Sequence, residues 1–181
     1  MVTSQSSTNA PLEDRRRREG ASPAFLLAQV GAHAAAKFAE RLEPLGLTPA
    51  HVGALRVIAA SAGSSQQDVA ARLGMFPSRL VALIDELEGR GLVERLENPH
   101  DRRIYVLQLT AKGKDVLQSI GPVAREHQEA LLAALNTEER DVLASLLLRV
   151  ADQQGLRRGV HPGFARLRPK LSRVTGTKDE P

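Results

Sequence analysis

The feature that most constrains this chain is a succession of two short amphipathic segments, a tight turn between them and two β-type runs, all within residues 64–113. The first amphipathic segment begins at adjacent serines, where either of two capping boxes fits, Ser64 with Gln67 or Ser65 with Asp68. The apolar residues after these serines recur at helical spacing. The sequence therefore predicts a short helix with one buried face, formed by Val69, Ala70 and Leu73.

The second amphipathic segment comes after a predicted helix stop at Gly74 and opens with Pro77, whose missing N–H is tolerated in a first turn. Its apolar residues recur at i, i+3, i+4 and i+7 and predict one inward stripe, formed by Leu80, Leu83, Ile84 and Leu87. The two halves of its outer face carry opposite charges. Arg79 lies in the first turn, and the carboxylates of Asp85, Glu86 and Glu88 lie in the second half. Since phosphates repel carboxylates, only the N-terminal half is predicted to approach a duplex, as a recognition helix does.

The outward side chains at the start of this second helix suit base recognition. Arg79 can donate to guanine O6 and N7, and Ser78 can contact a base or a phosphate. Val81 or Ala82 can meet a thymine methyl group. An ordinary surface helix with one arginine would show the same residues, so the choice depends on the part of the chain after this helix.

The next part of the chain predicts a β-hairpin, because two β-type runs, 92–96 and 104–109, flank a charged loop. Arg102 and Arg103 at the end of that loop can reach a minor groove, whose potential is most negative where the groove is narrow. Asp101 is placed to hold Arg103 by a paired hydrogen bond. A hairpin whose Asp–Arg pair only closes its own loop is the alternative. The order of helix, turn, helix and wing favours DNA contact, and the predicted DNA-binding residues are Ser65, Gln66, Pro77, Ser78, Arg79, Ala82, Asp101, Arg102 and Arg103.

Three short motifs resemble the signature of the MarR family of bacterial transcription regulators. They are Gly-Leu-Val-Glu-Arg at 91–95, Asp-Arg-Arg at 101–103 and Leu-Thr-Ala-Lys-Gly at 109–113, and the likeness extends from about residue 24 to residue 154. The resemblance implies a mainly α fold with a small β-wing, which is a winged helix-turn-helix within a six-helix dimer. It also implies a homodimer that binds a palindromic operator in double-stranded DNA and is often loosened by a small phenolic or other aromatic effector.

Carried over by position, the resemblance makes Ser78 and Arg79 groove contacts, Arg103 the minor-groove contact and Asp101 its brace. Phe76 departs from the family pattern, in which a capping Ser, Thr or Asp is more usual, and it is expected either to pack as a hydrophobic staple or to line a pocket. The resemblance places an effector pocket between the DNA-reading part and the dimer helices, with candidate residues His33, Phe38, His51, Arg56 and Phe76.

The length of the chain fits one domain with an extension at each end. Residues 1–23 form a polar, Arg-rich N-terminal arm, residues 24–154 the MarR-like domain, and residues 155–181 a basic, flexible C-terminal tail. The last helix, expected to begin at Thr137, holds more apolar residues than one buried face needs, which suggests pairing with another chain. Within the domain the predicted DNA-reading part is 64–109, and the predicted dimerisation helices lie in 24–44 and 111–154.

The net charge of +4 is unevenly distributed. Residues 24–154 carry 14 basic and 16 acidic side chains, whereas residues 155–181 carry 7 basic and 2 acidic ones. Global charge is therefore poor evidence for DNA binding, and the case depends on where the arginines lie. The arginines at 15–18 in the arm are expected to stay solvated or to contact the DNA backbone. The basic tail is expected to strengthen DNA binding non-specifically or only to aid solubility.

Several function classes lack support in the sequence. No cysteine is present, which excludes disulfides and thiolate metal sites, and the five histidines lack the close spacing of a metal motif. No nucleophile elbow, P-loop or dinucleotide fingerprint is present, so we expect neither an enzyme nor a cofactor. No apolar run approaches the roughly 18 residues of a membrane span, and the N-terminus lacks the apolar stretch of a signal peptide, so we expect a cytoplasmic protein.

The sequence therefore predicts a DNA-binding transcription regulator that is specific for its operator sequence, a repressor released by a small-molecule ligand. The alternative is a winged-helix protein-interaction module without specific DNA binding. Arginine at both 79 and 103 favours the regulator, because substitution of these two residues would have favoured the interaction module.

Overall fold

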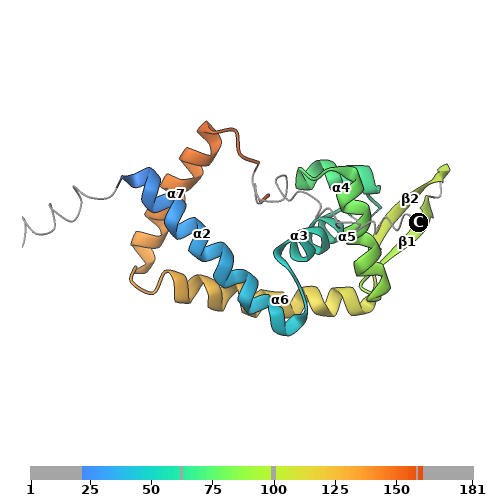
Figure 1. The fold of residues 1–181 in the computed structure, drawn as a ribbon, viewed down its shortest axis with the longest axis horizontal. Coiled ribbons are helices and arrows are strands. Elements are labelled where there is room, and N and C mark those ends of the chain that lie inside the picture. Colours follow the sequence, from blue (N-terminus) through green and yellow to red (C-terminus); the bar gives the residue numbers. More distant parts are fainter. Residues whose placement is uncertain (1–21, 62, 99–100, 158, 161–181) are drawn as a thin grey trace, which may run out of the picture.

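The computed structural model of the protein describes residues 22–61, 63–98, 101–157 and 159–160, with residues 101–103 described by their backbone alone. Within these residues six α-helices, a short 3₁₀ turn and a two-stranded antiparallel sheet succeed one another (Figure 1). In chain order they are α2 (Pro23–Leu42), η1 (Glu43–Leu45), α3 (Pro49–Ala60), α4 (Gln66–Leu73), α5 (Pro77–Gly89), β1 (Val93–Asn98), β2 (Asp101–Leu109), α6 (Ala111–Leu131) and α7 (Thr137–Gln153).

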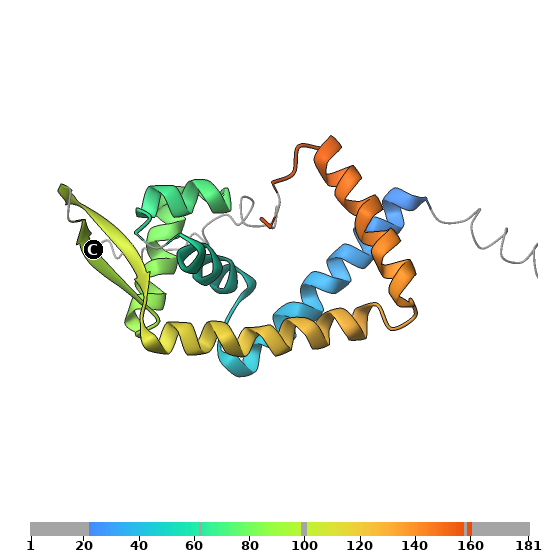
Figure 2. The same cartoon turned by 180° about the vertical axis from the view of Figure 1, so that it is seen from behind.

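The long helix α6 connects two groups of elements, as Figures 1 and 2 show. The helices α3, α4 and α5 and the sheet gather around the N-terminal part of α6, and we call this group the reading lobe. The helices α2 and α7 lie toward the opposite end of α6, and we call them the helical lobe. The predicted winged helix-turn-helix, α4–turn–α5–β1–β2, therefore forms within the reading lobe.

The helix starts agree with the predicted signals. Proline occupies the first turn of α2, α3 and α5, and a side chain caps each of α3, α4, α6 and α7. Of the two capping boxes that fit the start of α4, the one that forms is Ser65 with Asp68. Ser65 Oγ accepts from Asp68 N at 3.2 Å, and Asp68 Oδ2 accepts from Ser65 N at 3.1 Å. Gly74 has φ 62° and ends α4 in the left-handed region, as predicted.

The hydrophobic core lies mainly in the reading lobe. The predicted inward faces of α4 and α5 are confirmed, although Leu83 is only half-buried. In the helical lobe, Leu42 is the one buried residue of α2, and α7 has none among its described residues. Large apolar side chains of these two helices are instead 40% to 62% exposed, at Phe25, Leu26, Leu27, Val30, Val142, Leu146, Leu147, Leu148 and Val150.

The hairpin corrects one prediction. The sequence predicted strands over 92–96 and 104–109, but β1 reaches Asn98 and β2 starts at Asp101, so most of the predicted loop is strand. Glu97 pairs with Tyr105, and Asn98 pairs with Asp101 after a register shift. The Asn-Pro pair at 98–99 indicated a turn between the two β-type runs, and the charged residues beside it were assigned to the same loop. This hairpin projects from the lobe (Figure 1), so its outer part accommodates charge on both faces.

A short turn joins α6 to α7. α6 ends at Leu131, and α7 begins at Thr137 as predicted, with Asn136 as the residue that caps it. Asn136 and Glu139 form a capping box, with both N–H···O distances at 2.9 Å. Arg140 donates to the carbonyl oxygens of residues 132 and 135 at 2.9 Å and 3.0 Å, which satisfies backbone acceptors freed at the turn.

None of the helices within the described ranges combines the length and the apolar character that crossing a bilayer requires.

Candidate nucleic-acid interface

The start of α4 is fastened to the sheet. Leu107 N of β2 donates to the Ser64 carbonyl oxygen at 3.0 Å, and Ser65 forms an isolated antiparallel bridge with Val106. Ser65 Oγ also donates to Asp68 Oδ2 at 2.7 Å. The hydrogen bonds from the side chain and backbone of Ser65 lower the pKa of the Asp68 carboxyl. The first turn of α4 is therefore held against the wing.

The predicted contact residues at the start of α5 lie on its accessible side. Pro77, Ser78 and Ala82 are exposed, and Arg79 is partly exposed. The opposite side of the helix is completely buried, through Leu80, Ile84 and Leu87. Burial of three large side chains fixes the helix on the lobe while its N-terminal half stays accessible to a ligand as large as DNA.

Phe76 is the N-cap of α5, and it makes no side-chain capping hydrogen bond. Its ring is 70% exposed. The hydrophobic-staple prediction is therefore wrong, because a staple requires the ring to be packed against the next turn of the helix. Pro77 and the buried stripe of α5 fix the start of this helix without a side-chain cap.

Arg95 of β1 ties the wing to both helices of the helix-turn-helix. Its guanidinium forms ion pairs with Asp85 and Glu88, which lie about one turn apart on α5. With its amide oxygen turned toward β1, Gln66 of α4 accepts from Arg95 Nε at 2.7 Å and from Nη2 at 3.1 Å. The Arg95 side chain is only 20% exposed. One half-buried cation thus fixes α4, α5 and the wing relative to one another.

The carboxylates in the second half of α5 are therefore partly neutralised within the protein. The sequence predicted that Asp85, Glu86 and Glu88 would keep this half of the helix away from phosphates. Arg95 pairs with two of them, Asp85 and Glu88. The repulsion that DNA would meet along α5 is consequently weaker than the sequence alone implies.

His51 is a buried histidine, 3% exposed, in the first turn of α3. Its Nδ1 accepts from Thr48 N at 3.0 Å, so the ring proton belongs on Nε2. Nε2 lies near Glu86, but the alignment falls outside that of a hydrogen bond, and Nε2 has no such partner among the described residues. This histidine caps α3 and orients toward α5, which explains its burial without a bound ligand.

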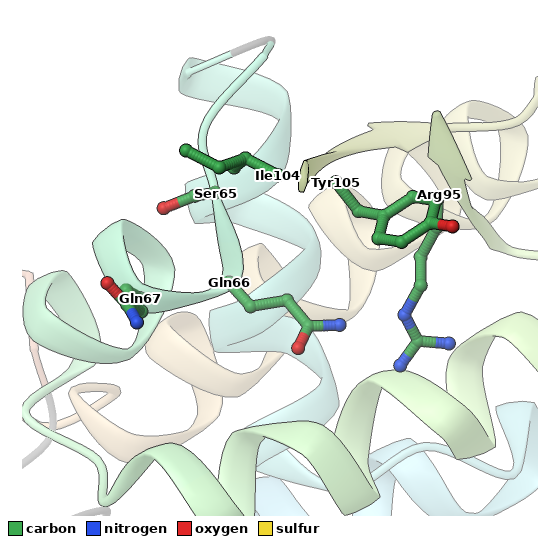
Figure 3. Close-up of a pocket in the computed structure, with 6 residues that line it drawn as sticks. All are labelled: Ser65, Gln66, Gln67, Arg95, Ile104 and Tyr105. Atoms are coloured by element: carbon green, nitrogen blue, oxygen red, sulfur yellow. The ribbon is translucent and has the colours of Figure 1, made fainter. Parts of the chain in front are cut away.

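A cleft of about 540 Å³ lies between the start of α4 and the sheet (Figure 3). Two predicted DNA-binding residues, Ser65 and Gln66, lie in its wall, and Figure 3 shows Gln66 extending toward Arg95. Ile104 and Tyr105 of β2 are 42% and 53% exposed and supply the apolar side. The complete lining is Ser65, Gln66, Gln67, Arg95, Ile104 and Tyr105. The cleft thus separates the two parts that would grip a duplex, the helix pair and the wing.

The wing residues Asp101, Arg102 and Arg103 begin β2 at the outer end of the hairpin (Figure 1). Their backbone continues the strand, and Asp101 pairs with Asn98. Their side chains lie outside the described residues, so the brace between Asp101 and Arg103 and the minor-groove contact stay predictions.

The five predicted effector-pocket residues are spread over α2, α3 and the turn before α5. His33, Arg56 and Phe76 are exposed. Phe38 is half-buried, with its ring centroid 5.3 Å from that of His127 on α6, and His51 belongs to the reading-lobe core. None of the five lines the cleft between α4 and the sheet, and their role stays a prediction. Within the described ranges no group of His, Asp and Glu residues could hold a metal ion.

Sequence reasoning assigned no role to two residues that shape this interface, Arg95 and Gly113, although they end the motifs at 91–95 and 109–113. Arg95 could have been found from the carboxylates at Asp85 and Glu88, because two acids one turn apart on a helix favour a cation beside them. Gly113 gives no such signal. A Cβ at this position would lie 2.0 Å from the Leu92 carbonyl oxygen, so α6 can approach the base of the wing only with glycine there.

Comparison with known proteins agrees with this architecture. The MarR family model matches residues 45–104. A solved structure of the transcriptional repressor CouR, bound to a 23-mer DNA duplex, is 30% identical, with a TM-score of 0.65 over 81% of this chain and 99% of that chain. The chain belongs to the MarR family. Its mainly α fold with a small β-wing is the winged helix-turn-helix that the sequence motifs predicted.

Three further proteins are similar to this chain. Wild-type MarR from E. coli, in its apo form, is 27% identical with a TM-score of 0.64, and the match covers 72% of this chain and 97% of that one. A putative transcriptional regulatory protein for the hcr operon of Thauera aromatica is 35% identical over 108 residues, which is 60% of this chain and 65% of the relative. The transcriptional repressor MprA of Escherichia coli K12 is 37% identical over 79 residues, which is 44% of this chain and 45% of MprA. The chain thus spans less than two thirds of the length of these two curated relatives.

Proposed function

We propose that this protein is a sequence-specific DNA-binding transcription regulator, a repressor that a small-molecule ligand releases. The observation that carries the proposal is the contact set of Arg95, which pairs with Asp85 and Glu88 of α5 and reaches Gln66 of α4. This one side chain joins the three elements that would touch DNA into a single surface. It also reduces the negative charge of the recognition helix. CouR, the relative that is bound to a duplex, supports the same assignment.

The second partner is another copy of the chain. The described residues of α7 include no buried side chain, and large apolar side chains of α2 and α7 are exposed on the helical lobe. Exposed apolar surface of this kind is typical of an interaction site. A two-fold pairing through these helices would present two recognition helices to the two halves of a palindromic operator, with half-sites about one helical turn apart.

The effector would be a small aromatic or phenolic molecule bound between the two lobes, near His33, Phe38, His51, Arg56 and Phe76. This part of the proposal rests on membership of the family. Binding there would change the separation of the reading lobes and so lower affinity for the operator. Because the DNA target lies in the cytoplasm, we assign the protein to that compartment.

The experiment that tests the function compares two duplexes of equal length, one from upstream of the protein's own coding region and one of scrambled sequence. Binding is measured across a salt series, because phosphate contacts alone give steep salt dependence and no sequence preference. The proposal expects tighter binding to the upstream duplex that persists at physiological salt. Equal, steeply salt-dependent binding to both duplexes would contradict it and favour the protein-interaction module.

A matched set of arginine variants tests the wing. Arg103→Ala is expected to weaken operator binding severely while the dimer stays intact, because it removes the predicted minor-groove contact. Arg125→Ala removes an exposed arginine of α6, outside the proposed pairing helices α2 and α7, and serves as the control, with unchanged binding. Full operator affinity in Arg103→Ala would show that the wing assignment is wrong.

A further inference from the structure

After α7 the chain returns to the reading lobe, as Figures 1 and 2 show. Leu156 N donates to the Ala151 carbonyl oxygen at 2.9 Å, which closes the end of α7. Arg157 then donates through Nη1 to the carbonyl oxygen of Ala71, close to the C-terminal end of α4. Val160 is half-buried and packs against the reading-lobe core. The start of the C-terminal tail therefore touches both lobes.

A hollow of about 570 Å³ lies where the tail meets the reading lobe. Arg72 enters it from α4 and Arg157 enters it from the tail, while Val57 and Val160 provide apolar wall. No carboxylate lines the hollow among the residues that the structure describes. The complete lining is Val57, Ala71, Arg72, Arg157, Gly159 and Val160, and we call it the two-arginine hollow.

The two arginines of this hollow are held by neutral oxygens. Arg72 Nη1 donates to Ser61 Oγ, and Arg157 Nη1 donates to the Ala71 carbonyl oxygen. Neither guanidinium belongs to an ion pair among the described residues. Asp68 attracts Arg72 at longer range, but its Oδ2 is already bonded to the backbone and hydroxyl of Ser65. Two like charges thus share one hollow with little local compensation.

We propose that the two-arginine hollow binds the phosphate group of a small phosphorylated molecule. A phosphate group carries about −1.5 to −2 charge at pH 7, which matches two guanidinium groups better than a monoanion does. A guanidinium group can donate two parallel hydrogen bonds to two oxygens of one phosphate group. Val57 and Val160 would contact an apolar substituent on the phosphate. A bound phosphate would bridge Arg72 and Arg157 and so clip the tail to α4.

A free small molecule fits the hollow better than the DNA backbone does. The predicted DNA contacts of α4 are Ser65 and Gln66 at its N-terminal end, whereas Arg72 lies in its last turn. Gln66 and Arg72 are six positions apart on the helix, which separates them by roughly 9 Å along its axis. The hollow is therefore a second site at the other end of α4, and it exists whether or not the chain binds an operator.

The test is calorimetric titration of the full-length protein, without DNA, against inorganic phosphate, phenyl phosphate and benzoate. We expect phenyl phosphate to bind more tightly than inorganic phosphate, because it adds contact with the two valines, and benzoate to bind at least tenfold more weakly. Arg72→Gln and Arg157→Gln should each weaken phenyl phosphate binding at least tenfold. Arg125→Gln, which replaces an exposed arginine of α6 outside the hollow and outside α2 and α7, is the matched control and should bind like the parent protein.

Three results would overturn the proposal: no binding of either phosphate at millimolar concentration, unchanged binding in Arg72→Gln and Arg157→Gln, or benzoate binding as tight as that of phenyl phosphate. Arg157 lies after the last helix, so its replacement removes no contact within a helix. If Arg72→Gln does not fold, Arg157→Gln alone still tests the hollow. Binding of a duplex of scrambled sequence shows whether the hollow takes a small phosphorylated molecule or a phosphate of the DNA backbone. Unchanged duplex binding in both variants supports a small-molecule site, whereas loss of duplex binding in both would assign the hollow to the DNA backbone.

Discussion

Replacing Arg95 by glutamine should damage operator binding although we assign Arg95 no contact with DNA. The side chain is 20% exposed and pairs with two carboxylates of α5 that are 58% and 40% exposed. It also donates to Gln66 of α4. Arg95→Gln removes the cation that orders the wing against both helices. It leaves Asp85 and Glu88 with uncompensated charge on the recognition helix.

The size of the effect depends on the exposure of the partners. Each half-exposed ion pair contributes about 0.5–1 kcal/mol after solvent screening. The hydrogen bonds to Gln66 add about 1 kcal/mol. The free energy of unfolding should therefore fall by about 2–3 kcal/mol, which lowers the Tm by roughly 4–12 °C for a chain of this length. Operator affinity should fall at least tenfold, or by about 1.4 kcal/mol, because repulsion between DNA and two carboxylates adds to the loss of order.

Calorimetric unfolding and operator titration of one protein series separate these two contributions. Arg95→Lys keeps the positive charge but lacks the planar guanidinium, which can pair with two carboxylates at once. We therefore expect its operator affinity to lie between those of the parent protein and Arg95→Gln. The variant Arg95→Gln with Asp85→Asn and Glu88→Gln lacks the cation and both carboxylates. If electrostatics dominates, this triple variant regains most of the affinity that Arg95→Gln loses.

Two results would refute this reasoning about Arg95. Parent-like operator affinity in Arg95→Gln would show that the wing does not need this anchor. An affinity of the triple variant no better than that of Arg95→Gln would show that carboxylate repulsion is unimportant. The control is Arg125→Gln, which removes an exposed arginine of α6 and should change neither the free energy of unfolding nor operator affinity.

Individual contacts support three further predictions. Gly113→Ala should reduce the free energy of unfolding in urea by about 1–3 kcal/mol, because its Cβ would meet the Leu92 carbonyl oxygen, and an unchanged value would disprove that close approach. Leu146→Asp should convert the proposed dimer to a monomer in sedimentation analysis, because it puts a charge on the exposed apolar face of α7; a stable dimer would place the interface elsewhere. Burial lowers the pKa of His127 below 6.5, and the charges of Arg41 and His33 lower it further. The folded state therefore binds fewer protons at His127 than the unfolded state does, and the free energy of unfolding decreases as the pH falls through 6.5. His127→Gln should therefore show a smaller loss of unfolding free energy between about pH 7.5 and 5.5 in urea titrations, and an identical loss would refute this linkage.

Local signals predicted the helix-turn-helix well because its starts and stops are chemically explicit. Pro77 and Gly74 impose backbone conformations that almost any tertiary context preserves, and the stripe of α5 has a clear helical period. The length of the strands was underestimated because all residues between the two β-type runs, 97–103, were assigned to the turn that Asn-Pro marks. Of the two alternatives for Phe76, the hydrophobic staple is wrong because a staple must be packed, whereas Phe76 is 70% exposed.

The contacts that make the candidate interface a unit could not be predicted in the same way. Arg95 meets Gln66 and Asp85 across separate elements, so their proximity depends on how the wing folds back on α5. The contact between Arg157 and Ala71 joins residues 86 positions apart and has no local pattern at all. Burial pattern and capping determine elements, whereas these side-chain contacts depend on the packing of elements against one another.

The central claim is that the N-terminal half of α5 and the wing recognise a specific DNA sequence in a dimer. Selection of bound duplexes from a random pool at physiological salt tests this claim most directly. We expect a palindrome whose half-sites lie about ten base pairs apart, and we expect the same selection with Arg79→Ala to lose preference at a guanine in each half-site. A pool that shows no enriched sequence with the parent protein would contradict the account.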